Sequence, residues 1–154
     1  MTDPTPATPS TVPPEAPAAP LGVRDLLGQL PSGALVERMG IRVLEGTAQR
    51  LVGTMPVEGN TQVTGLLHGG ASCVLAETLG SIGAMLHVWP DAVAVGTDIN
   101  ATHHRSATSG LVTGVATAIS LGRTLCSHEV VLTDDAGRRL CTARITNLVR
   151  PRTP

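Results

Sequence analysis

A chain of 154 residues, 42% of them hydrophobic, is long enough for one domain with a sizeable core. Its eleven basic and twelve acidic residues leave a net charge of −1, so no global field would attract nucleic acid or a membrane surface. All the basic residues are arginine and neither Phe nor Tyr occurs, which excludes lysine Schiff-base chemistry, a P-loop lysine and the stacking platforms of single-strand binders. We therefore expect no nucleic-acid partner.

The amino-terminal residues 1–20 predict a disordered tail rich in Pro, Ala and Thr. Seven prolines and no positive charge exclude both a signal peptide and a helix, and such a composition is typical of polyproline II segments. No run in the chain looks long and apolar enough to span a membrane, so no membrane partner is expected. Residues 21–154 are expected to form the single folded domain.

The first half of this domain predicts a short amphipathic helix, two strands and a long helix. The expected bounds are 21–30 for the short helix, which Pro31-Ser32-Gly33 ends, 39–46 and 47–57 for the strands, and 58–65 for a loop. Apolar residues at three- and four-residue spacing then predict about twenty helical residues from Gly69 to Trp89-Pro90. This helix is apolar on most sides, so we expect it to be buried.

The second half predicts four strands, over residues 92–105, 110–121, 124–133 and 139–149. Asp134-Asp135-Ala136-Gly137 is the clearest hairpin signal between them. Two strands, one helix and a meander indicate an α+β protein with an antiparallel sheet that curls round the helix. The sheet's outer face would need cover, for which Val112, Val130, Leu132 and Val149 are candidates, and pairing of two sheets in a dimer would supply it.

The three cysteines, Cys73, Cys126 and Cys141, lie far apart inside apolar segments. An odd number without CxxC pairs predicts buried, reduced core thiols and a cytoplasmic protein.

Glu77 is the only Asp, Glu, Lys or Arg residue of the long helix. A buried charge costs several kcal/mol unless it is paired or placed at a water-filled cleft. One interpretation is a carboxylate hydrogen-bonded to a neighbouring element. The other is a catalytic nucleophile or general base, for which partial burial would raise the pKa of the carboxyl group.

His68-Gly69-Gly70 opens the same helix, where the first backbone N–H groups lack intrahelical partners and the dipole is positive. The glycines would let a substrate carbonyl approach, which predicts an oxyanion site at the Gly69 N–H. A plain glycine turn with an incidental histidine is the alternative. Ser81 lies on the same face of the helix as Glu77. Its hydroxyl group either hydrogen-bonds back to a carbonyl of the helix or takes part in the site.

His103-His104 suggests a metal site at first sight. Adjacent strand residues point to opposite faces, however, and no Cys, Asp or Glu stands near them in sequence to complete a shell. We therefore expect no metal. Arg105 and Arg123 could simply be arginines of solvated loops.

The segment Gln62 to Ser81, with Gln-x5-His-Gly-Gly and a Glu nine residues after the His, resembles the hotdog-fold acyl-CoA thioesterases. It is most similar to the branch with 4-hydroxybenzoyl-CoA, phenylacetate-pathway and 1,4-dihydroxy-2-naphthoyl-CoA thioesterases, over roughly Met39 to Arg150. The resemblance implies a hotdog fold, in which a six-stranded antiparallel sheet wraps round one long central helix. It also implies a homo-oligomer, at least a dimer and expected to be a homotetramer (a dimer of dimers), with the active site at the dimer interface.

The resemblance also implies a role for each site residue. Glu77 would be the catalytic carboxylate, the Gly69 N–H would polarise the thioester carbonyl with Gln62 and His68 beside it, and Ser81 would hold the hydrolytic water. Coenzyme A belongs to the substrate, and no separate cofactor is implied. The residues that would bind it are Gly96, His103, His104, Arg105, Ser106, Gly122, Arg123 and Thr124.

The sequence thus predicts a hydrolase that splits an acyl-CoA into acid and CoA. An acyl pocket of Leu, Met, Val, Ile and Ala side chains can hold an aryl group or a medium-length chain. One alternative is a hotdog hydratase or dehydratase acting on 3-hydroxyacyl thioesters, although the chain has no Asp-x-Asn-Pro-x-His-like segment. The other is a non-catalytic CoA-binding module.

Overall fold

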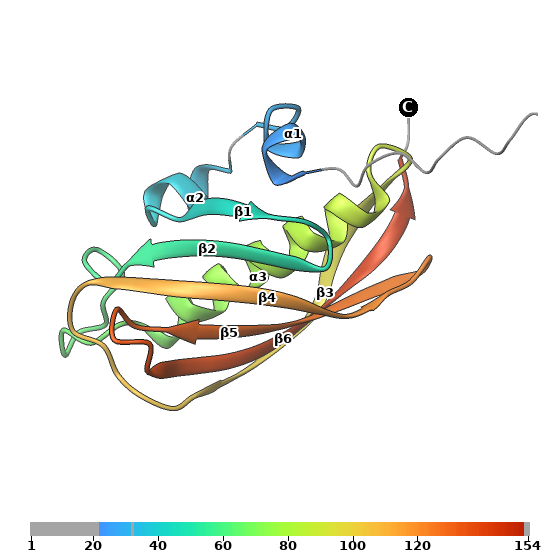
Figure 1. Ribbon diagram of the computed structural model, residues 1–154. Coiled ribbons are helices and arrows are strands. Elements are labelled where there is room, and N and C mark those ends of the chain that lie inside the picture. Colours follow the sequence, from blue (N-terminus) through green and yellow to red (C-terminus); the bar gives the residue numbers. More distant parts are fainter. Residues whose placement is uncertain (1–21, 32, 153–154) are drawn as a thin grey trace, which may run out of the picture.

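The computed structural model describes residues 22–31 and 33–152. The predicted tail over residues 1–20 lies outside them. Six strands form one antiparallel sheet in the order β1-β2-β4-β5-β6-β3, and the long helix α3 lies in its concave side (Figure 1). The α+β hotdog fold predicted from the sequence is confirmed. The elements are α1 (Val23–Leu27), α2 (Ala34–Arg38), β1 (Arg42–Gly46), β2 (Arg50–Pro56), α3 (Gly69–Val88), β3 (Ala92–His103), β4 (Leu111–Leu121), β5 (Leu125–Thr133) and β6 (Arg139–Pro151).

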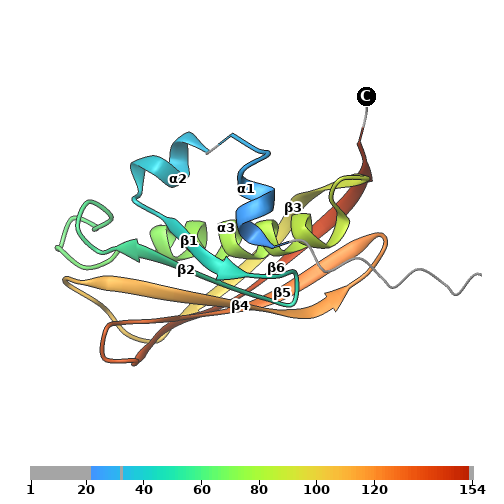
Figure 2. The ribbon, with the colours of Figure 1, turned by 45° about the horizontal axis from the view of Figure 1, so that its top comes forward.

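The amino-terminal part departs most from the prediction. A second short helix, α2, was missed, and the first strand begins at Arg42 and not at residue 39. Gly40 explains the difference, because its φ of 65° places the chain in the left-handed region between α2 and β1. Figure 2 shows α1 and α2 on the side of α3 that faces away from the sheet.

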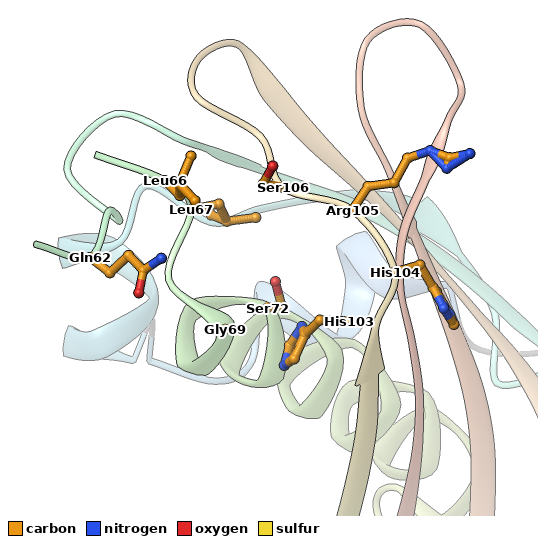
Figure 3. A pocket seen from close by; sticks show the side chains of 9 residues that line it. All are labelled: Gln62, Leu66, Leu67, Gly69, Ser72, His103, His104, Arg105 and Ser106. Carbon is orange, nitrogen blue, oxygen red and sulfur yellow. The ribbon is translucent and has the colours of Figure 1, made fainter. Parts of the chain in front are cut away.

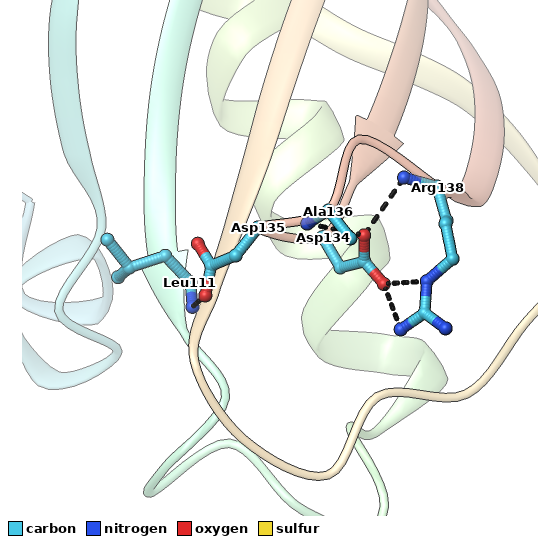
Figure 4. Close-up of polar contacts among 5 residues, drawn as sticks. All are labelled: Leu111, Asp134, Asp135, Ala136 and Arg138. Carbon is cyan, nitrogen blue, oxygen red and sulfur yellow. Dashed lines mark hydrogen bonds and ion pairs between the residues drawn. The ribbon is translucent and has the colours of Figure 1, made fainter.

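The hairpin between β5 and β6 follows its sequence signal. The Asp134 Oδ1 atom accepts hydrogen bonds from the backbone N–H groups of Ala136 and Arg138, and its Oδ2 atom pairs with the Arg138 side chain at 2.7 Å (Figure 4). These contacts hold the pKa of the Asp134 carboxyl group below its usual value, chiefly through the hydrogen bond from the Arg138 side chain. Asp135 turns the other way and accepts from the Leu111 N–H at 3.1 Å, which ties this hairpin to the start of β4.

A pair of glycines fixes the position of α3 on the sheet. Gly53 of β2 and Gly114 of β4 are register partners, and a Cβ atom on either would lie 2.7 Å from a methyl carbon of Leu79. The fully buried Leu79 side chain therefore occupies a hollow that only two glycines leave open. This contact sets both the rotation of α3 and its height above the strands.

The prediction that four apolar strand residues lie on the outer face of the sheet and need cover was wrong for three of them. Val112, Val130 and Leu132 are fully buried in the single chain, because the alternation of each strand turns them toward α3. Cys126 and Cys141 are buried free thiols as predicted, whereas Cys73 is only half-buried. Burial raises the pKa of Cys141 to about 11, which keeps this thiol protonated.

The membrane prediction was wrong on one point. By length and composition alone, α3 is apolar enough to cross a membrane. The core helix of a globular domain passes the same test, and α3 packs its buried residues against the sheet.

Candidate active site

The start of α3 leaves one backbone donor free. His68 is the N-cap residue, and its Nδ1 atom accepts from the Gly70 N–H at 2.8 Å. The carbonyl of His68 takes the N–H groups of Ala71 and Ser72. Among the described residues, the Gly69 N–H has no hydrogen-bond partner, so it remains available at the positive end of the helix dipole.

A cavity of about 390 Å³ opens beside Gly69 (Figure 3). His103 lies over this glycine, and a Cβ atom at residue 69 would stand 3.0 Å from the His103 Nε2 atom. Glycine is therefore needed for the close approach of the histidine ring as well as for access to the backbone. The cavity is lined by Gln62, Leu66, Leu67, Gly69, Ser72, His103, His104, Arg105 and Ser106.

This lining joins the predicted oxyanion residues to part of the predicted coenzyme site. Gln62 lies on the loop before α3, as expected, but His68 is absent from the lining because its ring caps the helix. His103 takes its place beside Gly69. His104 points to the other side, where its Nε2 atom lies 2.9 Å from the Thr142 hydroxyl, so the prediction that the two histidines face opposite ways is confirmed.

Glu77 is exposed in the single chain, so its predicted burial was wrong. Its side chain lies at a smaller cavity of about 220 Å³ between α3 and β3, lined also by Gly96, Thr97, Asp98, Ile99 and Ile145. A Cβ atom on Gly96 would stand 3.2 Å from the Glu77 Oε1 atom. Gly96 therefore gives room to the carboxylate, and β3 bulges directly after it, between Gly96 and Asp98.

The Glu77 charge also acts on a neighbouring thiol. Burial first, and then the charge of Glu77, raise the pKa of Cys73, which precedes Glu77 by one helical turn. The thiol stays protonated at neutral pH and therefore offers no thiolate nucleophile beside the carboxylate.

Ser81 has a partner that the sequence did not indicate. Its hydroxyl group donates to the Oδ1 atom of Asn147 on β6 at 3.0 Å. Asn147 is fully buried and faces Gly96 across the β3–β6 pair. Only the interruption of an apolar alternation in β6 could have pointed to Asn147, and its contact with Ser81 spans 66 residues of sequence.

Two distances show which predicted residues do not meet within one chain. Gly69 and Glu77 are separated by eight residues of helix, about 12 Å at 1.5 Å per residue, so one carbonyl group cannot contact both. The turn at Gly122–Thr124 lies beside Leu148 of β6, whereas His103 pairs with Cys141. Seven strand residues, about 23 Å, therefore separate the two predicted halves of the coenzyme site.

An apolar cleft of about 430 Å³ lies on the outer side of α3. Thr78, Ser81 and Ile82 of α3 form its floor, directly after Glu77 in the helix. Its walls come from α1, α2, β1 and the segments between them. They consist of Leu27, Leu30, Pro31, Gly33, Val36, Glu37, Ile41 and Val43.

The antiparallel sheet of six strands round one long helix defines a protein of the hotdog fold. Residues 64–141 match the sequence model of the Thioesterase superfamily, and the chain belongs to this family. It is 46% identical over 118 residues to the proofreading thioesterase EntH of Cronobacter turicensis, covering 76% of this chain and 86% of that protein.

Solved structures agree. The chain is similar to a thioesterase of Pseudomonas aeruginosa, with 42% identity, a TM-score of 0.74 and coverage of 77% of this chain and 86% of that one. It is also similar to a thioesterase of Haemophilus influenzae, with 36% identity, a TM-score of 0.77 and coverage of 84% and 90%. The protein is therefore an enzyme of the thioesterase class.

Proposed function

We propose that the protein hydrolyses acyl-CoA thioesters at a site built from two copies of the chain. The observation that carries this proposal is the free Gly69 N–H at one end of α3 and the Glu77 carboxylate about 12 Å further along it. Since one chain cannot bring both groups to one thioester, the second group must come from another copy. No specific observation favours either of the two alternatives, the dehydratase or the non-catalytic binding module.

The β3 edge offers the surface for this assembly. β3 pairs with β6 on one side, and among the described strands it has no partner on the other. Glu77 lies beside Gly96, and Gly69 lies beside His103. Two β3 strands paired antiparallel about a two-fold axis between these positions would place Gly96 opposite His103 of the second copy. Each Glu77 would then face the other copy's Gly69. A tetramer would need a further contact between such dimers.

In this site the Gly69 N–H would hydrogen-bond the thioester carbonyl oxygen and stabilise the negative charge that forms on it. Glu77 would act in one of two ways. As a base it takes a proton from a water, whose oxygen bonds to the carbonyl carbon as the C–S bond breaks, and the proton then passes to the CoA sulfur. As a nucleophile it forms a mixed anhydride and releases CoA thiolate before water completes the reaction.

The acyl group would lie in the apolar cleft beside Ser81. The cleft begins next to Glu77 and has no aromatic lining, so its aliphatic side chains suit an aryl ring or a medium-length chain. The coenzyme would extend along the cavity of His103 to Ser106. Arg123 would reach the phosphates only from another copy, because it lies about 23 Å away in the same chain. A cytoplasmic location stays a prediction.

Mixing two inactive variants tests the shared site. Glu77→Gln removes the charge, whereas Gly69→Pro removes the amide donor at a position where helices tolerate proline. Each homodimer should lose activity by at least about a hundredfold. Random pairing makes half of the dimers mixed, each with one intact site, so about a quarter of wild-type CoA release should return.

Gly69→Ala separates the two effects of the proline, because it keeps the N–H and adds only a methyl group against His103. Activity that Gly69→Ala retains and Gly69→Pro loses would report the amide donor. Activity that stays at the parental level while mixed dimers form would place the site within one chain. A screen of benzoyl, phenylacetyl, hydroxynaphthoyl and C6 to C12 acyl-CoA esters would then identify the acyl group. Absence of CoA release from every ester would contradict the proposed substrate class.

A further inference from the structure

Asn147 is an unexpected polar side chain in an apolar row. It lies on the inner face of β6, in line with Cys141, Ala143 and Ile145, and none of its surface is exposed. Its Nδ2 atom has no hydrogen-bond partner among the described residues. A buried donor without a partner is destabilising, so an apolar side chain would suit the fold better at this position.

The other buried asparagine shows what a purely structural role looks like. Asn60 uses its Nδ2 atom twice, donating to the carbonyls of Met39 and Pro56 at 2.9 Å each, and so holds two segments together. Asn147 joins no two backbone segments in this way. Among the described residues, the one hydrogen bond of its side chain is the one that it accepts from Ser81.

This single bond fixes the polarity of the Ser81 hydroxyl group. A serine hydroxyl has one proton to donate and two lone pairs that accept. Because Ser81 donates its proton to the Asn147 Oδ1 atom at 3.0 Å, the remaining hydrogen-bonding capacity of its oxygen is that of an acceptor. Without Asn147 the hydroxyl proton would be free to turn toward the backbone or toward Glu77.

The Glu77 carboxylate lies near the Asn147 oxygen that accepts the Ser81 proton. The position of a Cβ atom on Gly96 is 3.2 Å from the Glu77 Oε1 atom and 3.8 Å from the Asn147 Oδ1 atom. The two oxygens are therefore at most about 7 Å apart, so the carboxylate lies near the atom that holds the Ser81 proton. Ser81 follows Glu77 by one helical turn on the same face.

We propose that Asn147 is a positioning residue for the hydrolytic water. By taking the Ser81 proton it makes the Ser81 oxygen an acceptor for one water proton, while the Glu77 carboxylate accepts the other. With both protons held, a lone pair of the water oxygen is directed at the thioester carbon. As the C–O bond forms, the proton on the Glu77 side passes to Glu77 and then to the departing sulfur. This inference rests on the proposed function.

The variant Asn147→Leu tests the role, measured as kcat, KM and melting temperature with a CoA thioester. We expect kcat to fall about tenfold, the factor of one hydrogen bond in the transition state. The KM should hardly change, because Asn147 does not reach the coenzyme. The melting temperature should stay level or rise, since an unpartnered buried amide is removed. A merely structural asparagine would give the opposite pattern, with a lower melting temperature and an unchanged kcat.

A double-mutant cycle shows whether Asn147 acts through Ser81. Asn147→Leu should have no further effect on kcat in a Ser81→Ala background, whereas additive losses would refute the coupling. Thr146→Val is the matched control, because it replaces a polar residue of β6 on the opposite face of the sheet and should leave kcat unchanged.

Two further variants separate the possible failures. Asn147→Val, whose branched side chain suits a strand, is measured in parallel, and loss of folding in both variants would show that Asn147 is needed for structure and refute the proposal. If Glu77→Gln abolishes CoA release while Asn147→Leu retains full kcat, the positioning role alone fails. If Glu77→Gln retains activity, the proposed catalytic function fails first.

Discussion

Replacing Gly96 by valine should inactivate the enzyme without unfolding it. A Cβ atom at residue 96 would already stand 3.2 Å from the Glu77 Oε1 atom, which is tight for such a contact. The valine methyl groups extend about 1.5 Å further, so the carboxylate must move by roughly 1 Å. A misplacement of about 1 Å can cost about a hundredfold in rate, and we expect kcat to fall by that factor.

The assay is CoA release followed with a thiol reagent, beside the melting temperature of the same sample. Valine favours strands more than glycine does, so the melting temperature should stay level or rise. Gly96→Ala is the graded control, since its single methyl group requires a shift of only a few tenths of an ångström and should cost much less activity. A folded Gly96→Val enzyme with wild-type kcat would show that Glu77 does not work from this position.

Three other predictions concern stability and coenzyme binding. Leu79→Ala should lower the free energy of unfolding by about 2–5 kcal/mol in a urea titration, because it empties the hollow between Gly53 and Gly114. Burial lowers the pKa of His128 below 6.5 in the folded protein. As the pH falls below about 6.5, His128 therefore binds a proton in the unfolded chain before it does so in the folded one, and stability is lost. His128→Gln should therefore flatten the decline of the urea midpoint between about pH 7.5 and 5, and an unchanged slope would contradict this assignment. Arg105→Ala should raise KM for a CoA thioester more than for a pantetheine thioester, whereas equal losses would mean that the arginine supports the fold.

The regular part of the fold could be predicted from local sequence. Periodic apolar spacing gave the bounds of α3, and turn chemistry such as Asp134-Asp135-Ala136-Gly137 placed the four carboxyl-terminal strands within two residues of their observed starts and ends. The helix α2 was missed because none of its five residues is buried, whereas α1, of equal length, buries Val23 and Leu26 at a three-residue spacing.

The site could be predicted only where its residues lie close in sequence. Gln62, Gly69 and Glu77 belong to one segment with a recognisable spacing. Asn147 could not be found in this way, because its contact with Ser81 depends on how β6 lies beneath α3. The same limit explains why the separation of the two halves of the predicted coenzyme site could not be predicted. The distance between Ser106 and Arg123 follows from the pairing of β3 and β5 with β6 and not from the motifs themselves.

The hollow that receives Leu79 also bears on how new specificities could arise in this scaffold. Residues 53, 79 and 114 form a packing contact in which no residue can change alone. A side chain added at residue 53 or 114 would push α3 and carry Glu77 and Ser81 away from β3. Most of the cleft walls come from α1, α2 and the segments between them, which supply none of these three residues. Mutation, in nature or in a directed library, can therefore reshape these walls while the positions of Glu77 and Ser81 beside β3 are inherited unchanged.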